Sequence, residues 1–162
     1  MTQQTTMFTK VAELNTLWGN LKGDPTNPDW KKLSDQGKNI LDEYNELFDD
    51  GINPRNMNEV RDAICDILVF TLGLAHMAGI DVDADMTAVD ASNRSKFCHD
   101  MEDMEATILK YRSLGVEVQG EGAFPLAFVR STSSQVGNDK KLYQNNKILK
   151  SVSFKEPVFA EL

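Results

Sequence analysis

Acidic side chains recur at helical spacing in two neighbouring segments of the sequence. Glu43 and Glu46 are three residues apart, Asp62 and Asp66 are four apart, and Glu59 precedes Asp62 by one turn. Helices joined by a short loop pack antiparallel, so we expect the two acidic faces to converge. Converging carboxylates repel one another unless a cation is bound. An oxygen-only ligand set suits Mg²⁺ or Mn²⁺, and we predict such a site, with Glu59 as a reserve ligand.

The simpler interpretation is that these carboxylates are solvated surface charges, as is usual for two glutamates three residues apart on a helix. The setting of Asp66 argues against it. This residue stands among Cys65, Ile67 and Leu68, in a segment that is apolar almost all round. Because burying an unpaired carboxylate is costly, a ligand or a function is the usual reason for its presence.

The apolar periodicity around these residues is mostly helical. The longest apolar run extends from Ile67 to Ile80, and we expect it to form the buried helix of a bundle. Asn56 or Asn58 would cap this helix, and Gly79 would end it. After residue 115 the period shortens, and extended stretches flank the turn-like GEGAFP segment. The predicted helices cover residues 6–18, 29–48, 57–78, 83–97 and 101–115, the last either separate or continuing the fourth, and the predicted extended stretches cover 116–118, 126–129 and 141–154.

We therefore predict an all-α protein with a four-helix-bundle core and a small irregular or β C-terminal extension. Residues 1–112 would form the helical domain, and residues 113–162 would pack on it. Phe8, Trp18 and Trp30 are expected in the core.

The composition is that of a soluble globular protein, with 162 residues, 41% of them hydrophobic and 26% charged. A net charge of -8 argues against a nucleic-acid or membrane-surface binder. The opening residues lack the pattern of a secretory signal. Two cysteines, Cys65 and Cys98, give no disulfide framework, so we expect reduced core thiols and a cytoplasmic location.

Two further motifs make the pattern more specific. After Asp62-x-x-x-Asp66 and the apolar run come Gly79-Ile80-Asp81 and then Ser92-Asn93-Arg94-Ser95-Lys96. Together with Glu43-x-x-Glu46 they resemble the all-α nucleoside triphosphate pyrophosphohydrolase superfamily of MazG-like proteins, phosphoribosyl-ATP pyrophosphohydrolases and dimeric dUTPases, above all its small phage and bacterial members. The opening VAELNTLWG resembles the first helix of that family, and KILKSVSFKEPVF its C-terminal lysine-containing segment. The likeness covers about residues 7–97 and 146–159.

The resemblance implies a metal-dependent hydrolase in which water attacks the α-phosphorus of a nucleoside triphosphate and releases a monophosphate and pyrophosphate. Mg²⁺, with Mn²⁺ as an alternative, would be held by Glu43, Glu46, Asp62 and Asp66. The metal would position the triphosphate and acidify the attacking water. One of the two glutamates would serve as general base.

The resemblance also implies substrate-binding residues outside the acidic cluster. Asn15 would lie on the substrate side, where a tryptophan could stack on the base. Asn93 and Lys96, three residues apart, would face the phosphates. Lys147 and Lys150 would close over the phosphates from the C-terminal segment. Without its motif, Lys96 would be interpreted as a routine surface lysine.

Two alignments of the second acidic motif are open. The family's Glu-x-x-Asp spacing matches Glu59-x-x-Asp62, whereas alignment of the apolar helix puts Asp66 at the Asp position and Ala63 at the Glu position. We favour Asp62 and Asp66 as ligands. Asp90 stands where close relatives are expected to have histidine, which leaves its role undefined.

The competing hypothesis is a catalytically silent helical binding protein, either a nucleotide sequestrant or an acidic protein inhibitor. The Asp81-x-Asp83-x-Asp85 pattern does not favour a calcium site, because the EF-hand glycine and glutamate are replaced by Met86 and Ser92. We interpret this pattern as helix capping and expect Asp83 or Asp85 to cap the fourth helix. A bundle this short buries more surface by self-association, so we expect a homodimer or homotetramer with sites near the subunit junction.

Overall fold

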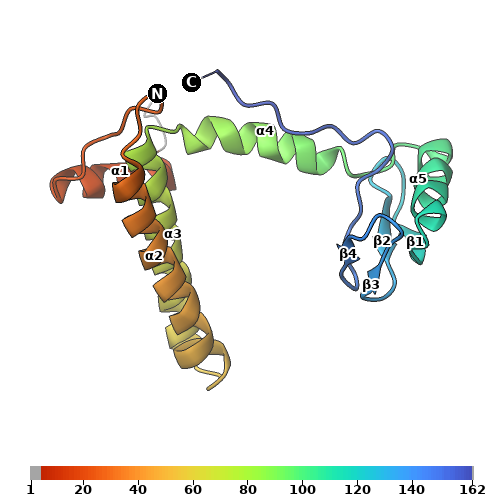
Figure 1. The fold of residues 1–162 in the computed structure, drawn as a ribbon, viewed down its shortest axis with the longest axis horizontal. Helices are drawn as coiled ribbons and strands as arrows, with labels where there is room; N and C mark the ends of the chain where they lie inside the picture. The colour runs from red at the N-terminus through yellow and green to blue at the C-terminus, as the bar shows by residue number, and fades with distance from the viewer. Residues whose placement is uncertain (1–4, 162) are drawn as a thin grey trace. The chain divides into compact units, whose positions relative to one another are not determined.

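The computed structural model describes residues 5–161. This part of the chain contains five α-helices, one π-helical turn and four short strands (Figure 1). The prediction of a mostly helical protein with a small β section near its C-terminus is confirmed. The contacts divide the chain into two compact units. Unit 1 comprises the described residues up to Asp85 together with residues 160–161, and unit 2 comprises Met86–Phe159.

A long helical hairpin dominates unit 1. Helix α2 (Trp30–Glu46) continues into the π-helical turn η1 (Leu47–Ile52), and the chain returns along α2 as helix α3 (Met57–Ala78) (Figure 1). The side chains of Asp29 and Asn56 cap the two helices by accepting bonds from Lys32 N and Asn58 N. Gly79 ends α3 in the left-handed conformation, with φ 78°. The predicted start and stop signals of the third helix are therefore confirmed.

Helix α1 (Met7–Leu17) and the following loop pack against the end of α3. Gly23 N donates to His76 O at 3.0 Å, and the His76 ring bonds to Asn20 O at 2.9 Å. Gly23 is required here, because a Cβ at this position would lie only 1.8 Å from Met77 O.

Unit 2 has its own hydrophobic core. Helix α5 (Met101–Ser113) packs on an antiparallel hairpin of β1 (Val118–Glu121) and β2 (Phe128–Ser131). A second small hairpin pairs β3 (Gln135–Val136) with β4 (Leu142–Tyr143). The buried core side chains are Cys98, Tyr111, Val116, Val118, Val129, Tyr143 and Leu149.

The boundary between the two compact units lies within α4 (Val82–Arg94), whereas the predicted limit of the helical domain at residue 112 stays a prediction. The boundary lies in α4 because α5 packs on the β-hairpin, so the fifth amphipathic segment belongs with the strands. The start of α4 also differs from the prediction. Asp81 caps it by accepting from Ala84 N at 3.2 Å, and not Asp83 or Asp85.

Several residues predicted to be in the core are exposed. Trp18 and Trp30 are 62% and 74% exposed; Trp18 follows the last turn of α1, and Trp30 is the first residue of α2. Phe8 is half-buried. Cys65 is exposed as well, whereas the prediction of a buried Cys98 is confirmed. Within residues 5–161, no helix taken singly is long and apolar enough to span a membrane, and α3 and α4 meet that test only as a pair broken by a bend.

Candidate functional site

The acidic faces of α2 and α3 meet at Glu43. Partial burial raises the pKa of Glu43, and the neighbouring carboxylates raise it further, in the order Glu46, Asp66, Asp42 and Asp62. Glu46 and Asp42 belong to the same helix as Glu43, but Asp62 and Asp66 reach it from α3. The other three predicted ligands thus lie within electrostatic range of Glu43.

The cluster is not an assembled ligand set. Among residues 5–161, no group of three or more His, Cys, Asp or Glu side chains is arranged to hold a metal ion. Glu43 and Asp66 are half-buried, whereas Glu46 and Asp62 are exposed. Across the same described residues, no Lys or Arg forms an ion pair with any of the four. The donor chemistry fits a hard divalent cation, and the side chains would have to turn inward to enclose one.

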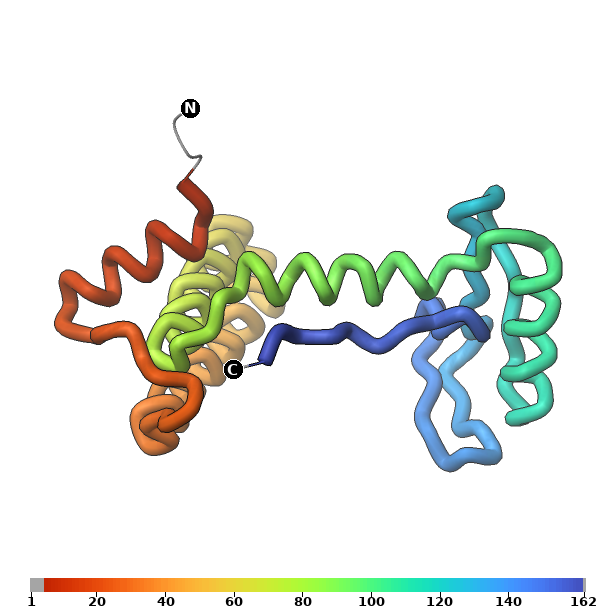
Figure 2. Tube along the Cα trace, turned by 90° about the horizontal axis from the view of Figure 1, so that it is seen from above, coloured from red at the N-terminus to blue at the C-terminus, as the bar shows by residue number. Residues whose placement is uncertain are grey.

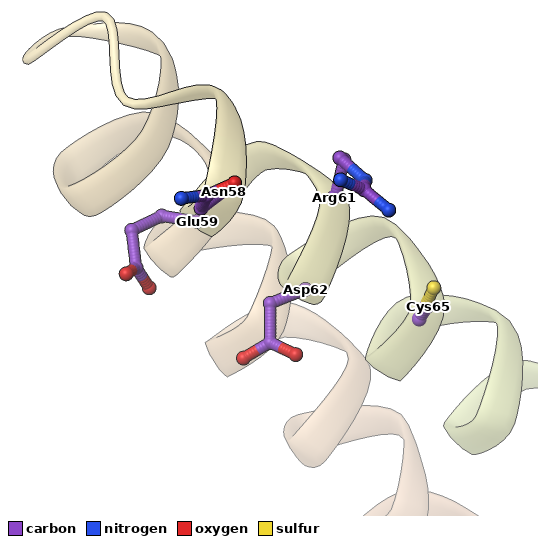
Figure 3. A pocket seen from close by; sticks show the side chains of 5 residues that line it. All are labelled: Asn58, Glu59, Arg61, Asp62 and Cys65. Carbon is purple, nitrogen blue, oxygen red and sulfur yellow. The ribbon is translucent and has the colours of Figure 1, made fainter.

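Glu59, the reserve ligand, lies one turn from Asp62 beside an open cavity of about 380 Å³. The carboxylates of Glu59 and Asp62 point to one side of α3, and the side chains of Arg61 and Cys65 lie on another (Figure 3). Glu59 is exposed. It could therefore add a fifth carboxylate at the η1 end of the cluster without displacing any packed group.

Asn15 is already engaged within unit 1. The residue is 2% exposed, and its amide donates to Val11 O at 3.0 Å and accepts from Asn20 Nδ2 at 3.2 Å. A Cβ on Gly73 of α3 would lie 2.9 Å from Asn15 Nδ2, so α1 approaches α3 closely here. In this arrangement Asn15 holds α1 and the following loop, and its role in substrate binding stays a prediction.

The other predicted substrate-binding residues come together in unit 2. Lys96, Lys147 and Lys150 line one cavity of about 410 Å³. Asn93 does not line this cavity, but its Oδ1 accepts from Lys96 Nζ at 2.7 Å. The same cavity is lined by Lys141, which the sequence did not single out. The sequence held one signal for Lys141, because this residue lies in the same predicted extended stretch as Lys147 and Lys150.

The two serines of the Ser92–Lys96 motif fasten the C-terminal segment. Ser92 Oγ donates to Lys155 O at 2.9 Å, and Ser95 Oγ accepts from Lys155 N at 2.9 Å. Ser151 Oγ in turn donates to Ser95 O at 2.8 Å. The segment accordingly runs beside the end of α4 (Figure 2). The motif therefore positions the chain that carries Lys150, a role that its spacing did not predict.

Comparison with known proteins gives little functional information. No family model and no solved structure matches the chain. The chain is similar to an uncharacterized protein of Acanthamoeba polyphaga mimivirus, with 32% identity over 139 residues. The alignment covers 83% of this chain and 50% of that relative, so the chain spans half the length of the curated protein it matches.

Proposed function

We propose that this chain is a metal-dependent nucleoside triphosphate pyrophosphohydrolase that releases a nucleoside monophosphate and pyrophosphate. The observation that carries the proposal is the approach of Asp62 and Asp66 to Glu43 across the α2–α3 hairpin. Four carboxylates without a basic partner among the described residues favour a bound cation over a structural ion-pair network. The motifs around them resemble those of the pyrophosphohydrolase superfamily.

Within this proposal each carboxylate has a task. Mg²⁺, or Mn²⁺, would neutralise triphosphate charge and acidify water when bound. Glu43 is the better placed of the two candidate bases, because its raised pKa makes it a stronger proton acceptor than an ordinary glutamate. The attacking water gives a proton to Glu43 Oε, and its oxygen forms a bond to the α-phosphorus. The bond between the α-phosphorus and the oxygen that bridges it to the β-phosphorus breaks, and pyrophosphate leaves with that oxygen. Glu46, Asp62 and Asp66 would hold the metal together with Glu43.

Asn93, Lys96, Lys147 and Lys150 are proposed to bind phosphate groups. The support is that the three lysines line one cavity of unit 2 and that Asn93 Oδ1 accepts from Lys96 Nζ. We place the activity in the cytoplasm, since both Cys65 and Cys98 are free thiols in the structure and a reducing compartment keeps them so.

We further propose that a second copy of the chain completes a four-helix bundle with the α2–α3 hairpin. Large apolar side chains along the hairpin are between 37% and 57% exposed, namely Leu41, Tyr44, Phe48, Ile64 and Leu68. A single hairpin offers these side chains no further helix, and two hairpins side by side would bury them.

Light scattering should report a dimer or tetramer, and Leu68→Lys should dissociate it. Leu109→Lys, at a 66% exposed leucine of α5, is the matched control. A wild-type monomer at every concentration would contradict the proposal.

The test of the function is pyrophosphate release from a panel of nucleoside triphosphates with Mg²⁺. We expect release to stop with chelator and in Asp66→Asn, and to persist in Asp49→Asn, which changes an exposed carboxylate of η1 outside the cluster. Circular dichroism would establish that each variant is folded. Release that survives both chelator and Asp66→Asn would refute the metal assignment. The absence of an assembled ligand set among residues 5–161 favours the alternative, a nucleotide-binding protein without turnover. Nucleotide binding without pyrophosphate release from any substrate would establish this alternative.

A further inference from the structure

The lysine cavity of unit 2, defined by Lys96, Lys141, Lys147 and Lys150, is lined by these four lysine residues and by no Asp or Glu. Its lysines come from three places in the chain, namely the turn after α4, the residue that precedes β4 and the segment that follows β4. Unit 2 as a whole is nearly neutral, with ten Lys and Arg against nine Asp and Glu in residues 86–159. The four lysines are therefore concentrated locally within a unit that carries almost no net charge.

The backbone around the cavity is fixed by hydrogen bonds to the core. Lys147 O accepts from Ser131 N at 3.1 Å, and Leu149 N donates to Val129 O at 2.8 Å. Lys150 O accepts from Tyr111 Oη at 3.0 Å. Because each of these bonds ties the segment to β2 or α5, the lysine stems start from defined positions and the site needs no folding step to form.

Only two of the four charges have a carboxylate partner in residues 5–161. Lys150 Nζ lies 2.5 Å from Glu156 Oε1, and Lys141 Nζ lies 3.7 Å from Asp139 Oδ2. Lys96 Nζ bonds to the neutral Asn93 Oδ1, and no ion pair is found for Lys147 in that part of the chain. Like charges held close together repel one another, so an anion that enters the cavity relieves this repulsion.

We infer that the lysine cavity binds the phosphoanhydride chain of a nucleotide or of inorganic polyphosphate, and that it does so without a divalent metal. The inference rests on the proposed function for the ligand class, and it adds Lys141 and a metal-independent binding step. Compact ammonium groups suit phosphate oxygens, and several of them around one concavity suit consecutive phosphates. A nucleic-acid backbone is disfavoured, because it would follow an extended basic stripe and be repelled by a chain of net charge -8.

The test is calorimetric titration of the full-length chain with inorganic tripolyphosphate in EDTA. Wild type should bind, and Lys141→Gln and Lys147→Gln should each raise the Kd about tenfold. Lys140→Gln is the matched control, since Lys140 is adjacent to Lys141 but does not line the cavity. Higher salt should weaken binding.

Further arms separate this inference from the proposed activity. Asp66→Asn should bind tripolyphosphate as wild type does, because its carboxylate belongs to unit 1. Binding in EDTA without pyrophosphate release under any condition would overturn the activity and leave the site standing. Failure of wild type to bind, or equal binding by wild type and both lysine variants, would overturn the site. Tighter binding of a single-stranded oligonucleotide than of tripolyphosphate would overturn the choice of ligand.

Discussion

Replacing Glu43 with glutamine should have opposite effects on stability in the absence and presence of a divalent cation. The pKa of Glu43 is raised in the folded chain by partial burial and by its carboxylate neighbours. A raised pKa means that the folded state holds the proton more tightly than the unfolded state. Protonation of Glu43 therefore stabilises the folded chain fully at a pH below the unfolded pKa, and this stabilisation is lost as the pH rises through the folded pKa. At pH 7 in EDTA, Glu43→Gln should therefore be more stable than wild type, and near pH 4 the difference should shrink.

The magnitudes follow from the geometry. A like-charge pair one turn apart on a helix, such as Glu43 and Glu46, costs about 0.2–0.5 kcal/mol, and Asp66 adds a contribution across the hairpin. A gain of about 0.5–1 kcal/mol corresponds to roughly 1–4 °C in Tm for a chain of this size. A cation at about one hundred times its Kd would instead stabilise wild type by about 2.7 kcal/mol, or roughly 5–10 °C.

The assay is thermal unfolding followed by circular dichroism, in EDTA and across a titration with MnCl₂, with NaCl at matched ionic strength. Wild type and Asp49→Asn should rise in Tm with Mn²⁺, and Glu43→Gln should rise much less because it has lost a ligand. The reasoning is refuted if Glu43→Gln is the less stable protein at pH 7 in EDTA. It is equally refuted if Mn²⁺ raises its Tm as far as that of wild type.

Three further predictions concern packing and positioning. Leu149→Ala, at a core residue 3% exposed, should cost about 2–5 kcal/mol in urea unfolding of the chain; a cost below that range would place Leu149 outside the core. Gly23→Ala should destabilise unit 1 by about 1–3 kcal/mol, because the added Cβ collides with Met77 O, and an unchanged urea midpoint would contradict the close approach of the loop to α3. Ser95→Ala removes the acceptor of Lys155 N, so hydrogen exchange of that amide should accelerate about five- to thirtyfold, whereas unchanged protection would show that the bond is not made.

Local signals in the sequence predicted most of the helix limits. Asn56 and Gly79 delimit α3 as expected, because capping and the left-handed turn depend only on nearby residues. The hairpin around GEGAFP formed for the same reason. Burial was harder to predict. Periodicity indicates which face of a helix is apolar, but not whether the same chain supplies a partner, and Ile64 and Leu68 remain 46% and 40% exposed.

The candidate site likewise has features that local sequence patterns predict and features that they do not. The convergence of Glu43 with Asp66 was predictable, because a helical spacing and a short connection fix which faces meet. The positioning role of Ser95 was not, since its partner Lys155 lies 60 residues away in sequence. Lys141 was missed because a lysine beside a short strand has no spacing that distinguishes it from a solvated charge. The division at α4 depended on long-range packing of α5, which no local pattern encodes.

The attachment of Lys155 to Ser92 and Ser95 also sets an order of assembly during translation. Unit 1 draws nearly all of its helices from residues that leave the ribosome first, so its hairpin can form while synthesis continues. Unit 2 is completed later, because Val129 of β2 accepts from Leu149 N and Ser95, just after α4, accepts from Lys155 N. A nascent chain therefore exposes the acidic hairpin well before it can offer four lysines to an anion.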